Sequence, residues 1–358
     1  MKVLLVAESL GSGGAERQLV GLAVGLKNKG YEIFVLTYYN ENFYKIILDN
    51  NKIYNEVYDK ALSRIPRLWY LNKKVNQFAP DVTISFLPGP NVALGFGKIV
   101  GFLKSKLIVS ERNYTWHWGI KERIYMYFYR RADAIITNSK AECDNIKQNF
   151  FSLSPKVACI VNFVDYEKFL PDTKKHYGKF KVLTVARIRD YKNVHGLINV
   201  ALGLVNKGLD IHFDWYGNDY NDKYSDYVKQ MIKNYNLSDR FIFHNPVSDI
   251  SAIYPQYDLF CLPSFKEGYP NVILEAMSCQ LPVICSRICE NGSIIVEGKG
   301  GFLFDPNNNE EIENCINRMY NLSCDDREQM GLYNRKRIIE NNSIKIFINK
   351  YIDLINHI

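Results

Sequence analysis

The chain has 358 residues, 47% of them hydrophobic and 14% aromatic, which is enough to fill two compact cores. It holds no run of about eighteen uncharged apolar residues, which argues against a transmembrane helix. Residues 1–170 hold 23 Lys and Arg against 15 Asp and Glu, a net of +8, whereas the remainder holds 22 against 23, a net of −1. The basic half favours an anionic partner, either nucleic acid, an anionic membrane surface or a diphosphate substrate; solubility alone is the other interpretation.

In chain order, the amino terminus predicts a strand at Val3 to Ala7, a Gly-rich loop at 11–14 and a helix from Ala15 to Lys29. The charge at Glu8 argues against a secretion signal. Further strands are expected at 32–38, 82–86, 107–110 and 134–137, and then at 181–186, 211–216, 241–243, 259–262, 283–286 and 301–304. Helical stretches fill the gaps, which predicts an α/β fold of two doubly wound parallel sheets.

The Gly-rich loop is a weak signal by itself. It lacks the third glycine of a dinucleotide fingerprint and the Gly-Lys-Ser/Thr of a P-loop. One interpretation is a tight turn between strand and helix. The other is that the backbone N–H groups at Gly13 and Gly14 face a phosphate of a ligand.

The most informative stretch is 264–277, which places Glu267 and Glu275 eight positions apart. Glu267 follows the strand at 259–262, and Asn271 is expected to cap the helix that contains Glu275. Both carboxylates are therefore expected at the carboxyl end of a parallel strand, where ligands bind in open α/β sheets. A solvated loop carboxylate and an ordinary helical residue are the simpler interpretation of such a pair.

Two bases follow another strand of the second half. Arg187 and Lys192 come directly after the strand at 181–186. A planar guanidinium and a compact ammonium group suit the two phosphates of a diphosphate. Without further context, a solvated basic loop is an equally good interpretation.

The stretch 264–277 closely resembles the E-x7-E signature of retaining glycosyltransferases of family 4, in the form S-x-x-E-G-x-P-N-x-x-x-E-A-M. Other segments are similar to elements of the same family in the same order, and these are 13–17, 110–113, 137–140, 161–165, 186–192 and 300–306. Phe163 and Ala186 stand where glycine is commoner in the family, and residues 40–77 match poorly. The resemblance otherwise extends from Val3 to the terminal helix.

This resemblance implies a GT-B fold with two Rossmann-like domains, at 1–170 and 171–342, and a cleft between them. The terminal helix, at about 343–358, is expected to cross back to the first domain. The implied chemistry is transfer of a hexose or N-acetylhexosamine from a nucleotide sugar, with UDP as the expected nucleotide. No cofactor is expected, and because the chain has no D-x-D motif, no metal is expected either.

The resemblance also implies roles for individual residues. The catalytic candidates are Glu267, Arg187 and Lys192. The donor-binding candidates are Gly13, Gly14, Arg187, Lys192, Pro246, Val247, Glu267, Gly268, Tyr269, Asn271, Val272 and Glu275. The acceptor-side candidates are Glu111, Arg112 and Asn138.

The expected acceptor is a hydroxyl of a growing surface glycan, such as capsule or O-antigen, on a lipid diphosphate carrier. Residues 91–131 interleave Lys and Arg with Trp, Tyr and Phe, which favours a cytoplasmic protein held at the inner face of an anionic membrane. The alternative is a solvated basic face. A non-catalytic or nucleic-acid-binding protein with a basic first domain is the competing function, but no dense Lys/Arg stripe or nucleic-acid-binding module is visible.

Overall fold

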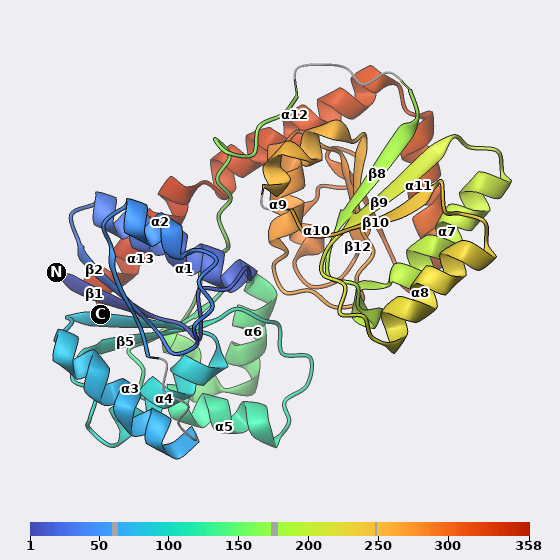
Figure 1. The fold of residues 1–358 in the computed structure, drawn as a ribbon. Coiled ribbons are helices and arrows are strands. Elements are labelled where there is room, and N and C mark those ends of the chain that lie inside the picture. Colours follow the sequence, from blue (N-terminus) through green and yellow to red (C-terminus); the bar gives the residue numbers. More distant parts are fainter. Residues whose placement is uncertain (59–63, 173–177, 248) are drawn as a thin grey trace. The chain divides into compact units, whose positions relative to one another are not determined.

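Two parallel sheets organise the chain (Figure 1). The structure, a computed structural model, describes residues 1–58, 64–172, 178–247 and 249–358. It contains two compact units: unit 1 comprises residues 1–163 and 344–358, and unit 2 comprises residues 164–343. This arrangement confirms the expected α/β fold with a doubly wound sheet in each half.

The sheet of unit 1 has seven strands in the order β3-β2-β1-β4-β5-β6-β7. Its strands are β1 (Lys2–Val6), β2 (Glu32–Thr37), β3 (Tyr54–Val57), β4 (Val82–Phe86), β5 (Lys106–Glu111), β6 (Ala134–Thr137) and β7 (Val157–Cys159). Its helices are α1 (Gly14–Asn28), α2 (Lys45–Asn50), α3 (Arg64–Phe78), α4 (Pro88–Ile99), α5 (Ile120–Tyr129), α6 (Lys140–Asn149) and α13 (Ile344–His357).

The sheet of unit 2 has six strands in the order β10-β9-β8-β11-β12-β13. Its strands are β8 (Phe180–Val185), β9 (Ile211–Tyr216), β10 (Phe241–His244), β11 (Leu259–Leu262), β12 (Val283–Ser286) and β13 (Gly301–Phe304). Its helices are α7 (Val194–Asn206), α8 (Lys223–Asn234), α9 (Asn271–Ser278), α10 (Asn291–Ile294), α11 (Asn309–Asn321) and α12 (Cys324–Asn341).

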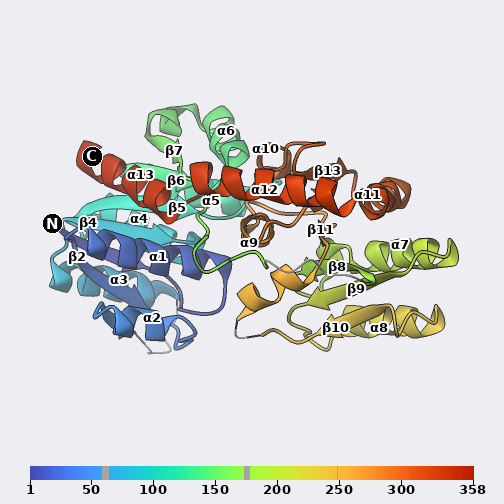
Figure 2. The ribbon, with the colours of Figure 1, turned by 90° about the horizontal axis from the view of Figure 1, so that it is seen from above.

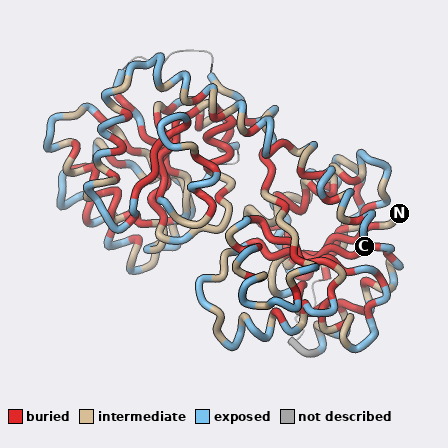
Figure 3. Tube along the Cα trace, turned by 180° about the vertical axis from the view of Figure 1, so that it is seen from behind, coloured by how far each residue is buried: buried red, intermediate tan, exposed pale blue. Residues whose placement is uncertain are grey.

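Each sheet is buried on both faces, because successive side chains of a strand point to opposite sides. In unit 1, Val3 and Leu5 pack toward α1, α2 and α13, whereas Leu4 and Val6 pack toward α3 to α6. In unit 2, α7, α8 and α11 cover one face of the sheet and α9 and α12 the other (Figure 2). The buried parts of the chain accordingly follow the strands in both units (Figure 3).

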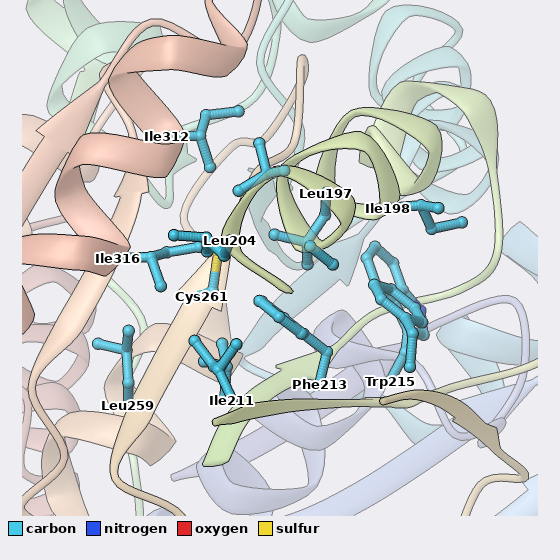
Figure 4. Packing of buried hydrophobic residues seen from close by; sticks show 14 of the residues in the cluster. Leu197, Ile198, Leu204, Ile211, Phe213, Trp215, Leu259, Cys261, Ile312 and Ile316 are labelled. Atoms are coloured by element: carbon cyan, nitrogen blue, oxygen red, sulfur yellow. The ribbon is translucent and has the colours of Figure 1, made fainter. Parts of the chain in front are cut away.

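Large apolar side chains fill the first of the two cores of unit 2. Phe213 and Trp215 on β9 lie beneath Leu197 and Ile198 of α7, with Ile312 of α11 close by (Figure 4). Cys261 on β11 also lies in this core, and its thiol is free. Burial raises the pKa of the Cys261 thiol, which makes it a packing residue in this structure.

The terminal helix α13 returns to unit 1 and packs along α1. One face is buried, through Phe347, Ile348, Tyr351 and Ile355, while the opposite face is exposed. The apolar residues at positions 344, 346, 347, 348, 351, 352, 354 and 355 predict a largely buried helix, but burial is limited to this one stripe. Gly25 of α1 permits the close approach, since a Cβ there would collide with Ile348.

In both sheets the strand order reverses beside the first strand of the unit. The neighbours at this point are β1 and β4 in unit 1 and β8 and β11 in unit 2. The loops that leave the carboxyl ends of two such strands diverge to opposite faces of the sheet and leave a crevice that suits a ligand. None of the helices within the described ranges is long and apolar enough to cross a membrane.

Candidate functional site

The carboxyl end of β8 presents two bases to the crevice of unit 2. Arg187 lies two residues beyond β8, is exposed, and forms no ion pair with any described residue. A short 3₁₀ turn at Asp190–Lys192 then leads into α7. Asn193, which joins the turn to the helix, adopts a left-handed conformation with φ of 57° and donates a hydrogen bond from its side chain to the Pro306 carbonyl. The end of the turn that follows Lys192 is therefore held in place.

Lys192 and Glu267 form an ion pair across this crevice. Lys192 Nζ lies 2.5 Å from Glu267 Oε1, and both side chains are largely buried. The loop after β11 is also joined to the loop after β8 through the backbone, because Phe265 N donates to the Tyr191 carbonyl at 2.8 Å. The structure thus brings together two residues to which the sequence assigned separate roles.

Glu275 is buried on the second turn of α9. Its Oε2 accepts a hydrogen bond of 2.8 Å from the Tyr254 hydroxyl. The sequence did not identify Tyr254, since nothing in the local pattern around residue 254 points toward α9. It lies on a short 3₁₀ segment, Tyr254–Gln256, just before β11.

The start of α9 differs from the prediction in one respect. Asn271 is the first helical residue and not the cap; the N-cap position is held by Pro270, with φ of −74° and ψ of 112°. Proline fits because the N-cap residue has extended backbone angles, which its ring allows. Asn271 and Val272, two of the donor-binding candidates, form the first turn of α9, and their contact with a donor remains a prediction. The Tyr269 hydroxyl accepts a hydrogen bond of 2.8 Å from the Asn342 side chain.

The neighbouring strand ends bring further polar groups to the same edge of the sheet. His244, the last residue of β10, stacks on Tyr216 of β9 with ring centroids 4.3 Å apart. His244 Nε2 also lies 2.5 Å from Asp214 Oδ1. Pro246 and Val247, the predicted contacts of the nucleobase, follow directly and are exposed. The sequence missed this stacked pair, because its partners lie on separate strands.

The two glycine candidates belong to unit 1. Gly13 is the N-cap of α1, with φ of −73° and ψ of 162°, and Gly14 is the first helical residue. As a glycine, Gly13 has no side chain to cap the helix, which begins in the loop after the carboxyl end of β1. The helix begins one residue earlier than the sequence predicted.

Of the acceptor-side candidates, Glu111 is buried at the end of β5. Its Oε1 accepts hydrogen bonds from the Tyr129 hydroxyl of α5 and, at 3.2 Å, from the Asn91 side chain of α4. Asn91 also donates to the Ser110 carbonyl at 3.0 Å and accepts from the Ser85 hydroxyl at 2.6 Å. Burial raises the pKa of the Glu111 carboxyl to about 7, although the two hydrogen bonds to it act in the opposite direction.

Arg112 and Asn138 are also buried, on the other side of the sheet from Glu111. The Arg112 guanidinium donates to the Asn162 side chain and lies 5.3 Å from the centre of the Phe86 ring. Asn138 donates to the Arg112 carbonyl at 3.0 Å. These two residues tie the ends of β5 and β6 to residue 162, and neither is exposed to solvent in this structure.

The crevice of unit 2 therefore combines an exposed guanidinium, a Lys–Glu ion pair and the start of helix α9. Such a set suits a diphosphate together with the hydroxyl groups of a sugar. Within the described ranges, no three His, Cys, Asp or Glu residues are grouped so that they could hold a metal ion.

Comparisons with known proteins agree with this chemistry. The sequence model for Glycosyltransferase Family 4 matches residues 12–168, and that for Glycosyl transferases group 1 matches residues 165–337. An uncharacterised glycosyltransferase of Haemophilus influenzae is 24% identical over 319 residues, 87% of each chain. A Campylobacter jejuni protein, GalNAc-α-(1→4)-GalNAc-α-(1→3)-diNAcBac-PP-undecaprenol α-1,4-N-acetyl-D-galactosaminyltransferase, is 26% identical over 288 residues, 77% of each chain.

The fold is shared with solved structures over the full chain. The Anabaena protein Alr3699/HepE, in a crystal structure with UDP, superposes with a TM-score of 0.86 at 18% sequence identity and covers 100% of both chains. Since the two sequence models match one unit each and the fold is that of GT-B enzymes, the chain belongs to the GT-B glycosyltransferases, with a family 4 domain followed by a group 1 domain.

Proposed function

We propose that this glycosyltransferase moves a hexose or N-acetylhexosamine from a UDP-sugar to a hydroxyl of a lipid-linked surface glycan, with retention of the anomeric configuration. The observation that carries the proposal is the set of charged side chains at the crevice of unit 2: Arg187 and Lys192 follow β8, and Glu267 follows the adjacent strand β11. Glu275 lies on α9, which also follows β11. All four charged residues therefore come after β8 or β11, the two strands at which the order of the sheet reverses.

The reaction breaks the bond between the anomeric carbon and the β-phosphate oxygen, and it forms a bond from that carbon to the acceptor oxygen. The nucleoside diphosphate leaves with an added negative charge, and the acceptor hydroxyl passes its proton through the leaving phosphate to solvent. Arg187 and Lys192 are placed to stabilise this charge without a metal. Glu267 would hold hydroxyls of the donor sugar, and Glu275 would accept from the ribose hydroxyls.

The Lys192–Glu267 pair adds a step to this account. Both side chains are largely buried, so the pair is held by strong attraction and each charge depends on the other. A bound diphosphate would attract Lys192, and a sugar hydroxyl would donate to Glu267. We infer that donor binding exchanges one ion pair for two substrate contacts, which keeps both buried charges satisfied.

The choice of donor and acceptor rests on the relatives. A solved structure with the same fold holds UDP, and the Campylobacter relative is named for transfer of N-acetylgalactosamine to a glycan on PP-undecaprenol. Another relative, 28% identical over 185 residues, is a capsular polysaccharide biosynthesis glycosyltransferase of Staphylococcus aureus. We therefore place the protein at the cytoplasmic face of the cell membrane, in peripheral contact with anionic lipid.

A screen of donors tests this proposal. UDP-, GDP- and dTDP-linked hexoses and N-acetylhexosamines are added singly, and both the unfolding temperature and slow hydrolysis are measured, with and without a chelator. A cognate donor at 100 times its Kd stabilises the fold by about 2.7 kcal/mol. We expect a UDP-sugar to raise the unfolding temperature and to be hydrolysed in the presence of the chelator. If no nucleotide sugar shifts the unfolding temperature or is hydrolysed, the proposal is wrong.

A further inference from the structure

The outer face of α5 in unit 1 carries a ridge of exposed apolar side chains. Ile120 is 82% exposed, Ile124 48% and Tyr127 50%. Their spacing of four and then three residues places them along one side of the helix. The opposite side packs into the core of the unit through Met126 and Tyr129. Three large apolar side chains in a continuous exposed row are unusual on a protein surface that contacts only water.

Basic side chains border this ridge. At 100° per residue, Arg123 lies on one flank of the ridge and Lys121 on the other, and Arg130 and Arg131 directly follow the last residue of α5. None of these four bases forms an ion pair with a carboxylate in the described part of the chain, and Glu122 is the one acidic residue between positions 119 and 131. Arg130 stacks on the Tyr127 ring at 3.9 Å and donates to its hydroxyl at 3.0 Å.

The segments that flank α5 extend the same surface. The Trp118 ring packs on Phe150 at 4.8 Å between centroids, and Arg123 lies 5.9 Å from the Phe150 ring. The next residue, Phe151, is almost fully exposed, and Trp116 in the loop before α5 is half exposed. The loop itself is anchored, because Thr115 N and its hydroxyl donate to the buried Glu142 at 2.9 and 2.7 Å. The aromatic residues are thus presented by a fixed backbone.

We propose that this α5 face, formed by Ile120, Ile124 and Tyr127 with Lys121, Arg123, Arg130 and Arg131, is the surface by which the protein docks on an anionic lipid bilayer. The apolar ridge would enter the boundary between headgroups and acyl chains, and the flanking bases would pair with lipid phosphates. Tyr and Trp favour this interfacial layer, since one end of each ring system is apolar and the other is polar. The inference gives the peripheral membrane contact of the proposed function a defined location, and to that extent it rests on that function.

Charge complementarity selects the bilayer over a second copy of the chain. A symmetric contact of this face with itself would oppose like charges across the ridge, which is unfavourable. An anionic surface satisfies all the bases at once, and the ridge needs no matching pocket. Arg130 is already held against Tyr127, so its guanidinium is ordered before docking.

Cosedimentation with vesicles tests the inference. The purified full chain is mixed with vesicles of phosphatidylcholine alone or of phosphatidylcholine with phosphatidylglycerol. Two variants change the surface: Ile120→Ser with Ile124→Ser, and Lys121→Glu with Arg123→Glu. The matched controls are Ile46→Ser with Ile47→Ser, which alters two exposed isoleucines of α2, and Lys223→Glu with Lys233→Glu, which makes the same charge change on α8.

The wild-type protein and both controls are expected to sediment with the anionic vesicles at low salt and to be released as salt rises. Each base is worth about a fivefold change in vesicle affinity, so the double charge reversal should weaken binding by roughly 25-fold or more. The isoleucine variant should also lose binding, while both surface variants keep the unfolding temperature and the donor hydrolysis of the wild type in the absence of vesicles. A surface variant that still hydrolyses the donor but no longer binds vesicles distinguishes a test of this inference from a test of the proposed function.

Four results would overturn the inference. The wild-type protein could stay in the supernatant with anionic vesicles at low salt. The surface variants could sediment as the wild type does, or the controls could lose binding equally. Finally, sedimentation velocity could show that Ile120→Ser with Ile124→Ser converts a dimer into a monomer without a change in vesicle binding, in which case the face joins two copies of the chain.

Discussion

Glu111 shows how a single buried carboxyl can make the stability of this enzyme depend on pH. The groups that act on the Glu111 carboxyl are Tyr129, Asn91 and the more distant Glu142, and none of these three is a base. Burial therefore dominates, and the pKa of the carboxyl rises from 4.5 to about 7. At neutral pH the folded chain holds this proton far more tightly than the unfolded chain does.

We predict that Glu111→Gln makes the free energy of unfolding less dependent on pH. Because the folded pKa is raised, the contribution of Glu111 is fully present below pH 4.5 and is lost as pH rises through about 7. The free energy of unfolding of the wild type, relative to the variant, should fall by roughly 3 kcal/mol across this window. Chemical denaturation of both proteins at a series of pH values measures the difference, and parallel curves would contradict the prediction.

At this scale, the sequence predicted that the charged residues of the candidate donor site lie at one edge of the sheet, but it did not predict their partners. Arg187, Lys192 and Glu267 follow strands whose apolar runs are unmistakable, so their place at the carboxyl edge could be predicted. The pairing of Lys192 with Glu267 spans 75 positions and depends on side-chain packing within one crevice. Similarly, the burial of Glu111 and Arg112 could not be predicted, because Glu111 ends β5 and Arg112 begins a loop whose path the sequence does not define.

At the scale of elements, the loop after β9 lies against the loop after β8. Gly217 N donates to the His244 carbonyl at 3.1 Å, and a Cβ at Gly217 would collide with the Ala186 carbonyl oxygen. The same oxygen accepts a 2.7 Å hydrogen bond from Trp215 Nε1. Any side chain at position 217 therefore displaces the backbone next to Arg187.

We predict that Gly217→Ala lowers the free energy of unfolding by about 1–3 kcal/mol, as overpacking does, and raises the donor KM. The donor KM rises because the displaced backbone carries Arg187. The control is Gly292→Ala, whose added methyl group meets only Leu303, at 3.9 Å. Thermal unfolding and donor kinetics are measured for both variants. If the two variants have the same stability and the same donor KM, the close contact between these loops is not important for either property.

The strands also show where the sequence was informative. All eleven predicted strands are present, and six of the eleven have the predicted bounds, namely β4, β6, β9, β11, β12 and β13. Strands β3 and β7 were missed. These two are the edge strands of the first sheet. An edge strand pairs on one side and buries fewer side chains, so its apolar pattern is weak, and β3 has no fully buried residue at all. Central strands, buried on both faces, gave near-continuous apolar runs.

At the scale of the whole molecule, unit 1 depends on the last helix of the chain. The stripe of four buried side chains on α13 joins the core that β1 and α1 form. Burial of each such side chain contributes about 1.5–3 kcal/mol. Their sum is comparable with the stability of a typical domain, so residues 1–163 without α13 lack an essential part of the core of unit 1.

We predict that ending the chain at Asn342 abolishes activity and makes the protein insoluble. A graded test uses Ile348→Ala, which should lower the free energy of unfolding by about 2–4 kcal/mol, because it leaves a cavity against α1. Lys350→Ala, on the exposed side of the same helix, should change it by less than about 0.5 kcal/mol. Denaturant unfolding checks both values. A soluble and fully active truncated chain would contradict the assignment of α13 to the core of unit 1.

The central claim, that the crevice of unit 2 binds and activates a nucleotide sugar, is tested most directly by turnover of the cognate donor in single-site variants. Arg187→Ala, Lys192→Ala and Glu275→Gln are compared with the wild type and with Lys181→Ala, which alters an exposed base at the opposite end of β8. Unfolding temperatures are measured first. Because Lys192→Ala leaves Glu267 buried without its partner, the double variant Lys192→Ala with Glu267→Gln is included. We predict that each site variant stays folded and that its turnover falls by roughly 10²–10³-fold. The turnover of Lys181→Ala should equal that of the wild type. Wild-type turnover in all the site variants would contradict the central claim.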